Sequence, residues 1–282
     1  MFESSDGQRM PREAVTGAAV HIRPLASLAD CNECVELQRE VWGFEPDEIV
    51  PAALLHVVDY VGGVAAGAFD DDETLLGFVF GISGIHDGEL AHWSHMLGVR
   101  ESARDMGVGR MLKEHQRTVL AERNVARIFW TFDPLMAKNA YFNLNLLGAA
   151  LVEYAPNMYG STASPLHLGL PTDRLVVCLT TARQPAAQLA LPPDEDLPVM
   201  TAFARPEDRP LGADDDDGAR IVLIEMPADI LDVLASAPAL AATWRMSVRE
   251  NFQWALHNDY SLRGVHRSAR SNRSFYVMVR DG

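Results

Sequence analysis

The sequence predicts an α/β protein with a mixed, mostly antiparallel sheet flanked by helices, followed by a C-terminal β-α-β-β extension. Two observations support this prediction. Short apolar runs of the buried-strand type alternate with stretches of helical periodicity, which favours some parallel neighbours in the sheet. Two other apolar runs flank the acidic segment at 70–73, which is typical of an antiparallel hairpin.

The first half of the predicted sheet precedes residue 100. Residues 20–25 alternate as a strand, and Ser27 is a suitable N-cap for a helix that runs to Trp42, with Asp30 in its first turn. A second helix is expected within 50–63. The strands that follow are expected at 64–70, 74–84 and 90–99.

The second half alternates helices and strands. Apolar residues at 108, 111, 112, 119 and 120 share one face of a helix that Asn124 is suited to end. A strand is expected at 126–134, and then a short helix with Gly148 as its C-cap. Two more strands are expected at 150–160 and 173–181.

Shifts in composition divide the chain into four parts. Residues 1–18 are expected to be a flexible N-terminus, 19–182 the main domain, and 183–219 an acidic, proline-rich linker. Residues 220–282 are expected to form the C-terminal lobe. In that lobe Pro227 stops a strand, Pro238 separates two helical pieces, and a hairpin closes the chain.

Composition excludes several functions. A net charge of −15 argues against a nucleic-acid partner, because phosphate binding needs a basic surface. The chain has no apolar run long enough for a membrane span and no signal-peptide pattern, so we expect a cytoplasmic protein. Cys31 and Cys34 form a C-x-x-C that lies within a helical pattern and lacks a second pair. We therefore expect reduced thiols and no metal, rather than a zinc or redox site.

A glycine pair opens the helix after the strand at 90–99. Gly107 and Gly109 lie in the segment RDMGVG, which runs from Arg104 to Gly109. Glycines at this place let backbone N–H groups approach a ligand closely, and a helix N-terminus favours an anion. The segment therefore predicts an anion-binding loop.

This segment resembles the GNAT acetyltransferase superfamily, whose loop has the form [RQ]-x-x-G-x-[GA]. The order of elements over 19–182 is also similar, as is Asn139 followed by a short helix that ends in Leu147-Gly148. Longer stretches are similar to bacterial GNAT-like proteins. The resemblance implies that acetyl-CoA is the cosubstrate and that the bound anion is its pyrophosphate. The cofactor-binding residues that it implies are Leu97, Gly98, Val99, Arg104, Asp105, Met106, Gly107, Val108, Gly109, Arg110 and Asn139.

The resemblance also implies a cleft where the strand at 90–99 splays from the strand at 126–133. His95 is our first candidate for the general base, ahead of His92, because it lies near this splay and titrates near neutrality. The alternative for each is a structural histidine. A β-bulge in this strand would move the side chain of His95 to the other face of the sheet. The sequence therefore does not decide which face His95 occupies.

Two further catalytic candidates follow the second strand of the cleft. Asp133 could orient the amine or accept its proton, and the alternative is a turn-forming aspartate before Pro134. Many members of the family carry a tyrosine acid four residues before the glycine of Leu-Gly, but here that residue is Leu144. Tyr141, about one helical turn earlier, is the substitute that we consider for this acid.

The sequence therefore favours an acetyl-CoA-dependent N-acyltransferase in which the amine of a small metabolite attacks the thioester directly. The alternative is a catalytically inactive GNAT fold that binds CoA as a sensor or interaction module, which the departure at Leu144 favours. No membrane or nucleic-acid partner is expected. The sequence does not decide whether the protein forms a homodimer.

Overall fold

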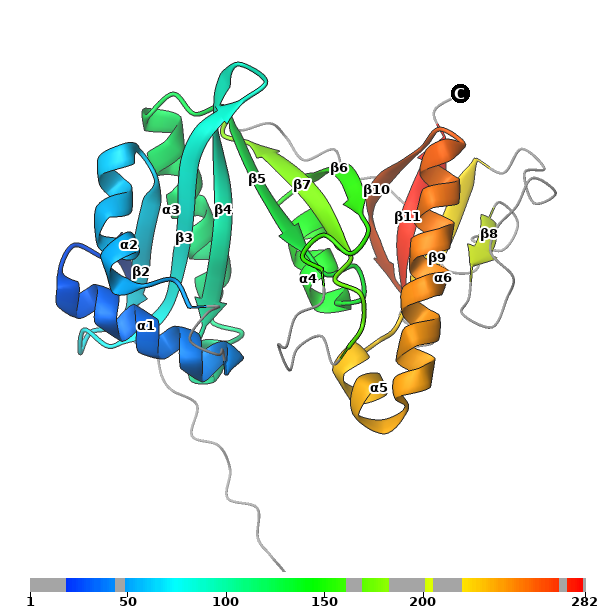
Figure 1. Ribbon diagram of the computed structural model, residues 1–282, viewed down its shortest axis with the longest axis horizontal. Coiled ribbons are helices and arrows are strands. Elements are labelled where there is room, and N and C mark those ends of the chain that lie inside the picture. Colours follow the sequence, from blue (N-terminus) through cyan, green and yellow to red (C-terminus); the bar gives the residue numbers. More distant parts are fainter. Residues whose placement is uncertain are drawn as a thin grey trace, which may run out of the picture.

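The computed structural model describes residues 19–43, 49–160, 169–182, 201–204, 220–268 and 273–280. The expected N-terminal segment at 1–18 lies outside these residues. The described chain forms one seven-stranded and one four-stranded sheet with helices packed against them (Figure 1). No helix in these ranges is both long and apolar enough to cross a membrane.

The larger sheet has the strand order β1-β2-β3-β4-β5-β7-β6. Its neighbours are antiparallel except for β4 and β5, which are parallel. The predicted mixed, mostly antiparallel sheet is confirmed. Its strands are β1 (His21–Pro24), β2 (Val64–Phe69), β3 (Leu75–His86), β4 (Glu89–Val99), β5 (Arg127–Phe132), β6 (Ala150–Ala155) and β7 (Arg174–Thr180).

Helices cover both faces of this sheet. In Figure 1, α1 and α2 lie in front of β2 and β3, while α3 lies behind them. Two separate apolar clusters correspond to the two faces, one of them beneath α1 and α2 and the other beneath α3 and α4. The helical elements are α1 (Leu28–Trp42), α2 (Ala52–Val57), η2 (Val58–Val61), η3 (Glu101–Ala103), α3 (Val108–Glu122), α4 (Ala137–Tyr141) and the π-helical turn η4 (Phe142–Leu146).

Local sequence signals mark the start of α1 and the end of η4. Ser27 is the N-cap of α1, as predicted, and the structure adds a reciprocal capping box between Ser27 and Asp30. Cys31 and Cys34 are buried in α1 as free thiols. The C-cap of η4 is Leu147 and not Gly148 as expected, but Gly148 directly after it has the positive φ of 72° that is typical of the residue following a C-cap.

The smaller sheet contains the expected β-α-β-β order and one strand that was not expected. Residues 201–204 were predicted to be linker, but they form β8 (Thr201–Ala204), which pairs in parallel with β9. A four-residue edge strand in a proline- and aspartate-rich stretch has too little periodicity to stand out. The remainder of the predicted linker lies outside the described residues. The other elements are β9 (Ile221–Met226), α5 (Ile230–Ser236), α6 (Pro238–His257), β10 (Tyr260–Arg267) and β11 (Ser274–Arg280).

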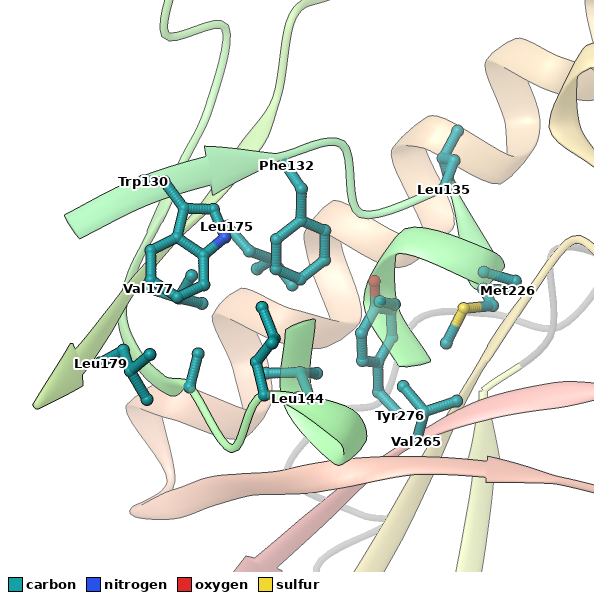
Figure 2. Packing of buried hydrophobic residues seen from close by; sticks show 14 of the residues in the cluster. Trp130, Phe132, Leu135, Leu144, Leu175, Val177, Leu179, Met226, Val265 and Tyr276 are labelled. Atoms are coloured by element: carbon teal, nitrogen blue, oxygen red, sulfur yellow. The ribbon is translucent and has the colours of Figure 1, made fainter. Parts of the chain in front are cut away.

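Helix α6 joins the two sheets into a continuous core. The ring of Phe252 lies 5.3 Å from that of Tyr154 on β6 and 4.8 Å from that of Tyr276 on β11. Figure 2 shows Tyr276 and Val265 of the smaller sheet on the far side of Leu144 from Trp130 of β5. The C-terminal elements therefore pack directly against α4, η4 and β6.

Candidate active site

The strands β4 and β5 pair along only part of their length. Their paired residues are Ala91 with Arg127, His92 with Ile128, and Trp93 with Phe129. β4 then continues to Val99, while β5 turns away from it (Figure 1). The expected splay between these strands is therefore present, and it begins directly after Trp93 and Phe129.

A β-bulge in β4 lies just inside the splay. Phe80 pairs with Met96 and Gly81 with Ser94, which leaves His95 as the extra residue. Met96 packs against the apolar cluster beneath α1, and the ring of His95 meets Phe80 of that cluster at 6.1 Å. The bulge thus places His95 and Met96 on the same face of the sheet, which the sequence could not decide.

His95 has the properties of a proton acceptor. Its side chain is exposed, and the surrounding protein lowers its pKa by desolvation of the charged form. The imidazole is therefore neutral at neutral pH and can take up a proton. Its placement at the bulge, next to the opening between the strands, keeps it as the candidate base.

His92 belongs to a buried hydrogen-bond network instead. It is 1% exposed, and burial together with the nearby Lys113 lowers its pKa to about 3. Gln116 lies 3.1 Å from Nε2, and Ser83 lies 3.0 Å from Nδ1. Because the Gln116 carbonyl accepts from Lys113, its amide N–H₂ is the group that donates to Nε2. Nδ1 then carries the proton, so His92 is a structural histidine in one tautomer.

The glycine loop opens α3 as expected. Gly107 is the N-cap residue of α3 with φ 78°, and no side chain caps the first turn. A side chain at Gly107 would point into open space, so the backbone here is bare. Arg104 and Arg110 are exposed on either side of this helix end. Bare N–H groups, the positive end of a helix and two cations fit an anion such as a pyrophosphate.

The end of β4 lies against the start of this helix. The position of a Cβ on Gly109 would be 3.5 Å from the Leu97 side chain and 3.8 Å from the Phe142 ring. Strand end, glycine loop and η4 therefore meet at one place. Asn139 is exposed on α4, three residues before Phe142, and so belongs to the same side of that helix. The structure brings together the predicted cofactor-binding residues of β4 and the loop.

Tyr141 contacts the smaller sheet through its ring. The guanidinium of Arg267 on β10 lies 5.1 Å from the centre of its ring. Leu144, the residue at which the resemblance would imply a tyrosine, is buried. The π-helical turn at 142–146 adds a residue to the turn, so the simple one-turn relation between Tyr141 and Leu144 does not hold. The geometry does not support Tyr141 as the acid.

Asp133 is held by two arginines and its own turn. Arg245 donates to its Oδ2 at 2.6 Å, and Arg174 lies 3.6 Å from the same oxygen. Oδ1 accepts a bond of 2.8 Å from the backbone N–H of Leu135, as in the turn-forming alternative. These contacts favour an organising role for Asp133 over proton acceptance.

A cavity of about 380 Å³ opens on the face of the sheet opposite α3. Its apolar walls include Trp93 and Phe129, the last residues at which β4 and β5 pair. Glu153 is the carboxylate among its lining residues. The volume lies within the usual range for small-molecule sites. The other apolar side chains in the lining are Ile82, Ile85, Ala91, Val152, Met158 and Val176.

Lys113 was not singled out from the sequence. It is 5% exposed on α3, and its Nζ donates to Ser94 Oγ at 2.7 Å. Its Nζ also lies 4.1 Å from the centre of the Trp130 ring. One signal was available, because Gln116 occupies a place in the buried stripe of Val108, Leu112 and Leu120. A polar residue on an apolar stripe indicates a buried partner.

No family model and no curated protein matches this chain. Over 60% of its length it is similar to the ribosomal-protein-S18-alanine N-acetyltransferase from Escherichia coli, at 15% identity and a TM-score of 0.46, with 98% of that chain covered. Aminoglycoside 6'-acetyltransferase type Ii is 21% identical over 59% of this chain and 99% of its own, with a TM-score of 0.46. A chain of the NatC complex bound to Gag peptide and CoA is 14% identical over 57% of this chain and 98% of its own, with a TM-score of 0.46.

Proposed function

We propose that the protein transfers an acetyl group from acetyl-CoA to the amine of a small molecule. The observation that carries the proposal is the separation of β4 from β5 directly beside the uncapped N-terminus of α3. A gap between strands accepts an extended arm, and a bare helix end accepts a pyrophosphate. The resemblance of the glycine loop to the GNAT pattern supports the same ligand.

Each part of the cosubstrate has residues suited to it. Residues 104–110 would hold the pyrophosphate through backbone N–H groups, with the exposed Arg104 and Arg110 adding positive charge. Leu97, Gly98 and Val99 would line the arm at the end of β4, with Asn139 on the opposite side. The backbone near the bulge would polarise the thioester carbonyl.

His95 is the proposed general base for direct attack by the amine. Its neutral imidazole can accept the proton that the amine loses as the new bond forms. We assign Asp133 a positioning role, because it organises the segment after β5 through Arg245 and Arg174. With Leu144 in place of the usual tyrosine, solvent would protonate the departing thiolate.

The cavity beside Trp93 is the proposed acceptor site. Its apolar walls favour an amine carried on an apolar body, and Glu153 would attract the amine in its protonated form. The cavity adjoins the last pair of β4 and β5, so a bound amine would lie near the start of the splay.

Calorimetry with acetyl-CoA and CoA tests the proposal. We expect wild-type protein to bind both, and Gly107→Trp to abolish binding by filling the space above the loop. Gly88→Trp is a matched control, because Gly88 has the same φ of 78° and equally open surroundings on the β3–β4 hairpin. Failure of the wild type to bind either ligand would refute the proposal.

A CoA-binding sensor is the second candidate function. The buried Leu144 favours it, because the usual acid is absent from that position. A panel of amines with detection of released thiol separates the two functions. CoA binding without thiol release from any amine would support the sensor.

A further inference from the structure

The polar pair of Lys113 and Ser94 lies at the point where β4 and β5 part. Ser94 directly follows Trp93, and Trp130 directly follows Phe129, the last residues that pair. Lys113 Nζ bridges these two positions, at 2.7 Å from Ser94 Oγ and 4.1 Å from the Trp130 ring centre. The side-chain amine of Lys113 thus lies at the narrow end of the gap between β4 and β5, on the side of α3.

Lys113 is poorly compensated for a buried cation. Within the described ranges no carboxylate lies within 4.0 Å of its Nζ, and the hydrogen-bond partners of Nζ there, Ser94 and Gln116, are neutral. The titratable group that faces it from β4 is His92, which is itself neutral. Desolvation lowers the pKa of Lys113 to about 7, so much of the amine is unprotonated near neutral pH.

The amine is also held in one orientation. Gln116 Oε1 lies 3.4 Å from Nζ, and the Gln116 amide is fixed in turn by His92. A hydroxyl within hydrogen-bond reach of a base, with the base oriented by a third group, is the arrangement that activates a nucleophilic serine. Pairs of serine and lysine are a known variant of this arrangement.

We propose that Ser94 and Lys113 form a nucleophile–base pair that takes an acyl group from a thioester or ester, giving the protein a hydrolytic activity beside amine acylation. Ser94 Oγ bonds to the acyl carbon, its proton passes to Lys113 Nζ, and the C–S or C–O bond of the donor breaks. The proton on Nζ then goes to the departing thiolate or alkoxide. Water next attacks the serine ester, Lys113 takes the proton of the water and returns it to Ser94 Oγ, and the carboxylic acid leaves.

This inference rests on the proposed function only where the donor is acetyl-CoA. A small activated ester, p-nitrophenyl acetate, carries no CoA, so its reaction with the pair would not depend on recognition of CoA. The experiment therefore uses both donors, in the absence of an amine acceptor.

Mass spectrometry of wild-type protein after mixing with each donor is the first measurement. We expect one acetyl group on the peptide that contains Ser94, released by alkaline hydroxylamine because it is an ester. Steady hydrolysis of p-nitrophenyl acetate should accompany it, with a rate that rises with pH through about 7 as Lys113 loses its proton.

Three variants complete the test. Ser94→Ala and Lys113→Met should each lower the rate of p-nitrophenyl acetate hydrolysis by at least about 100-fold. Ser274→Ala is the matched control, because Ser274 is a strand serine of equal burial at 5% exposure, and it should keep the wild-type rate. The wild-type adduct and the Ser94→Ala variant decide the matter even where Lys113→Met fails to fold.

An adduct from either donor would support the pair of Ser94 and Lys113. The outcomes also distinguish a failure of this pair from a failure of the proposed function. An adduct from p-nitrophenyl acetate without any CoA binding would support the pair and refute the acetyl-CoA proposal. CoA binding without an adduct from either donor would refute the pair alone. A hydroxylamine-stable acetyl group on Lys113, or unchanged hydrolysis by Ser94→Ala, would also overturn it.

Discussion

Asn145 of η4 pairs through its side-chain amide with both backbone groups of Val265 on β10. Its Nδ2 donates to the Val265 carbonyl at 2.9 Å, and its Oδ1 accepts from the Val265 N–H at 2.9 Å. β10 is the edge strand of the smaller sheet, so Asn145 takes the place that a further strand would occupy. This pair of hydrogen bonds links the smaller sheet to η4, which lies beside the end of β4 and the glycine loop.

Replacement of Asn145 by leucine should destabilise the protein by roughly 2–4 kcal/mol, because two backbone groups of a buried residue lose their partner. Urea unfolding measures the change. Asn145→Asp keeps the acceptor and loses the donor, so its loss should be intermediate. An unchanged unfolding midpoint for Asn145→Leu would show that the pairing contributes nothing.

Asp133→Asn should cost about 3 kcal/mol in the free energy of unfolding. The variant leaves the charge of Arg245, which is only 2% exposed, without its 2.6 Å partner. Asp59→Asn is the control, because its ion pair with Arg123 is exposed and should contribute less than about 1 kcal/mol. An unchanged free energy of unfolding for Asp133→Asn would contradict the organising role of Asp133.

The stability of the protein should fall as the pH drops from about 6.5 toward 3, in part because of His92. The unfolded chain takes up a proton on this imidazole below about 6.5, whereas the folded chain keeps it neutral down to about 3. The unfolded state then binds more protons, so stability rises with pH across this window. Relative to His92→Gln, the wild type should lose roughly 2 kcal/mol between pH 6.5 and pH 5 in urea unfolding. Equal slopes for the two proteins would contradict the neutral, buried state of His92.

His95→Gln should lower kcat/KM for the amine by about 100-fold or more and leave CoA affinity unchanged. In the wild type the acidic limb of kcat/KM should have its midpoint below the ordinary histidine pKa, because desolvation lowers the pKa of His95. The variant should lose that limb. His115→Gln is the control, since its pKa is also lowered by desolvation but it lies on α3, and it should retain the wild-type profile. A limb that survives in His95→Gln would assign the base elsewhere.

Much of the secondary structure was predictable from the sequence because its signals are local. The capping box at Ser27 and the acidic hairpin at 70–73 each involve only a few consecutive residues, and the apolar stripe of α3 lies within a single helix. The glycine loop was also visible, since Gly107 is needed where φ is positive. The short strand at 201–204 was missed because its pairing with β9, not its own composition, makes it a strand.

The sequence by itself determined the order of the elements, the turns and the presence of a loop suited to an anion. The tertiary structure decided which side chains meet: a bulge turns His95 to the face of Phe80, a π-helical turn leaves Tyr141 against Arg267, and α3 brings Lys113 to Ser94. The physical reason is the separation in sequence between the residues that interact. Backbone conformation follows from neighbours a few residues away, whereas strand register and buried polar pairs depend on contacts between residues as far apart as Asn145 and Val265, 120 positions along the chain.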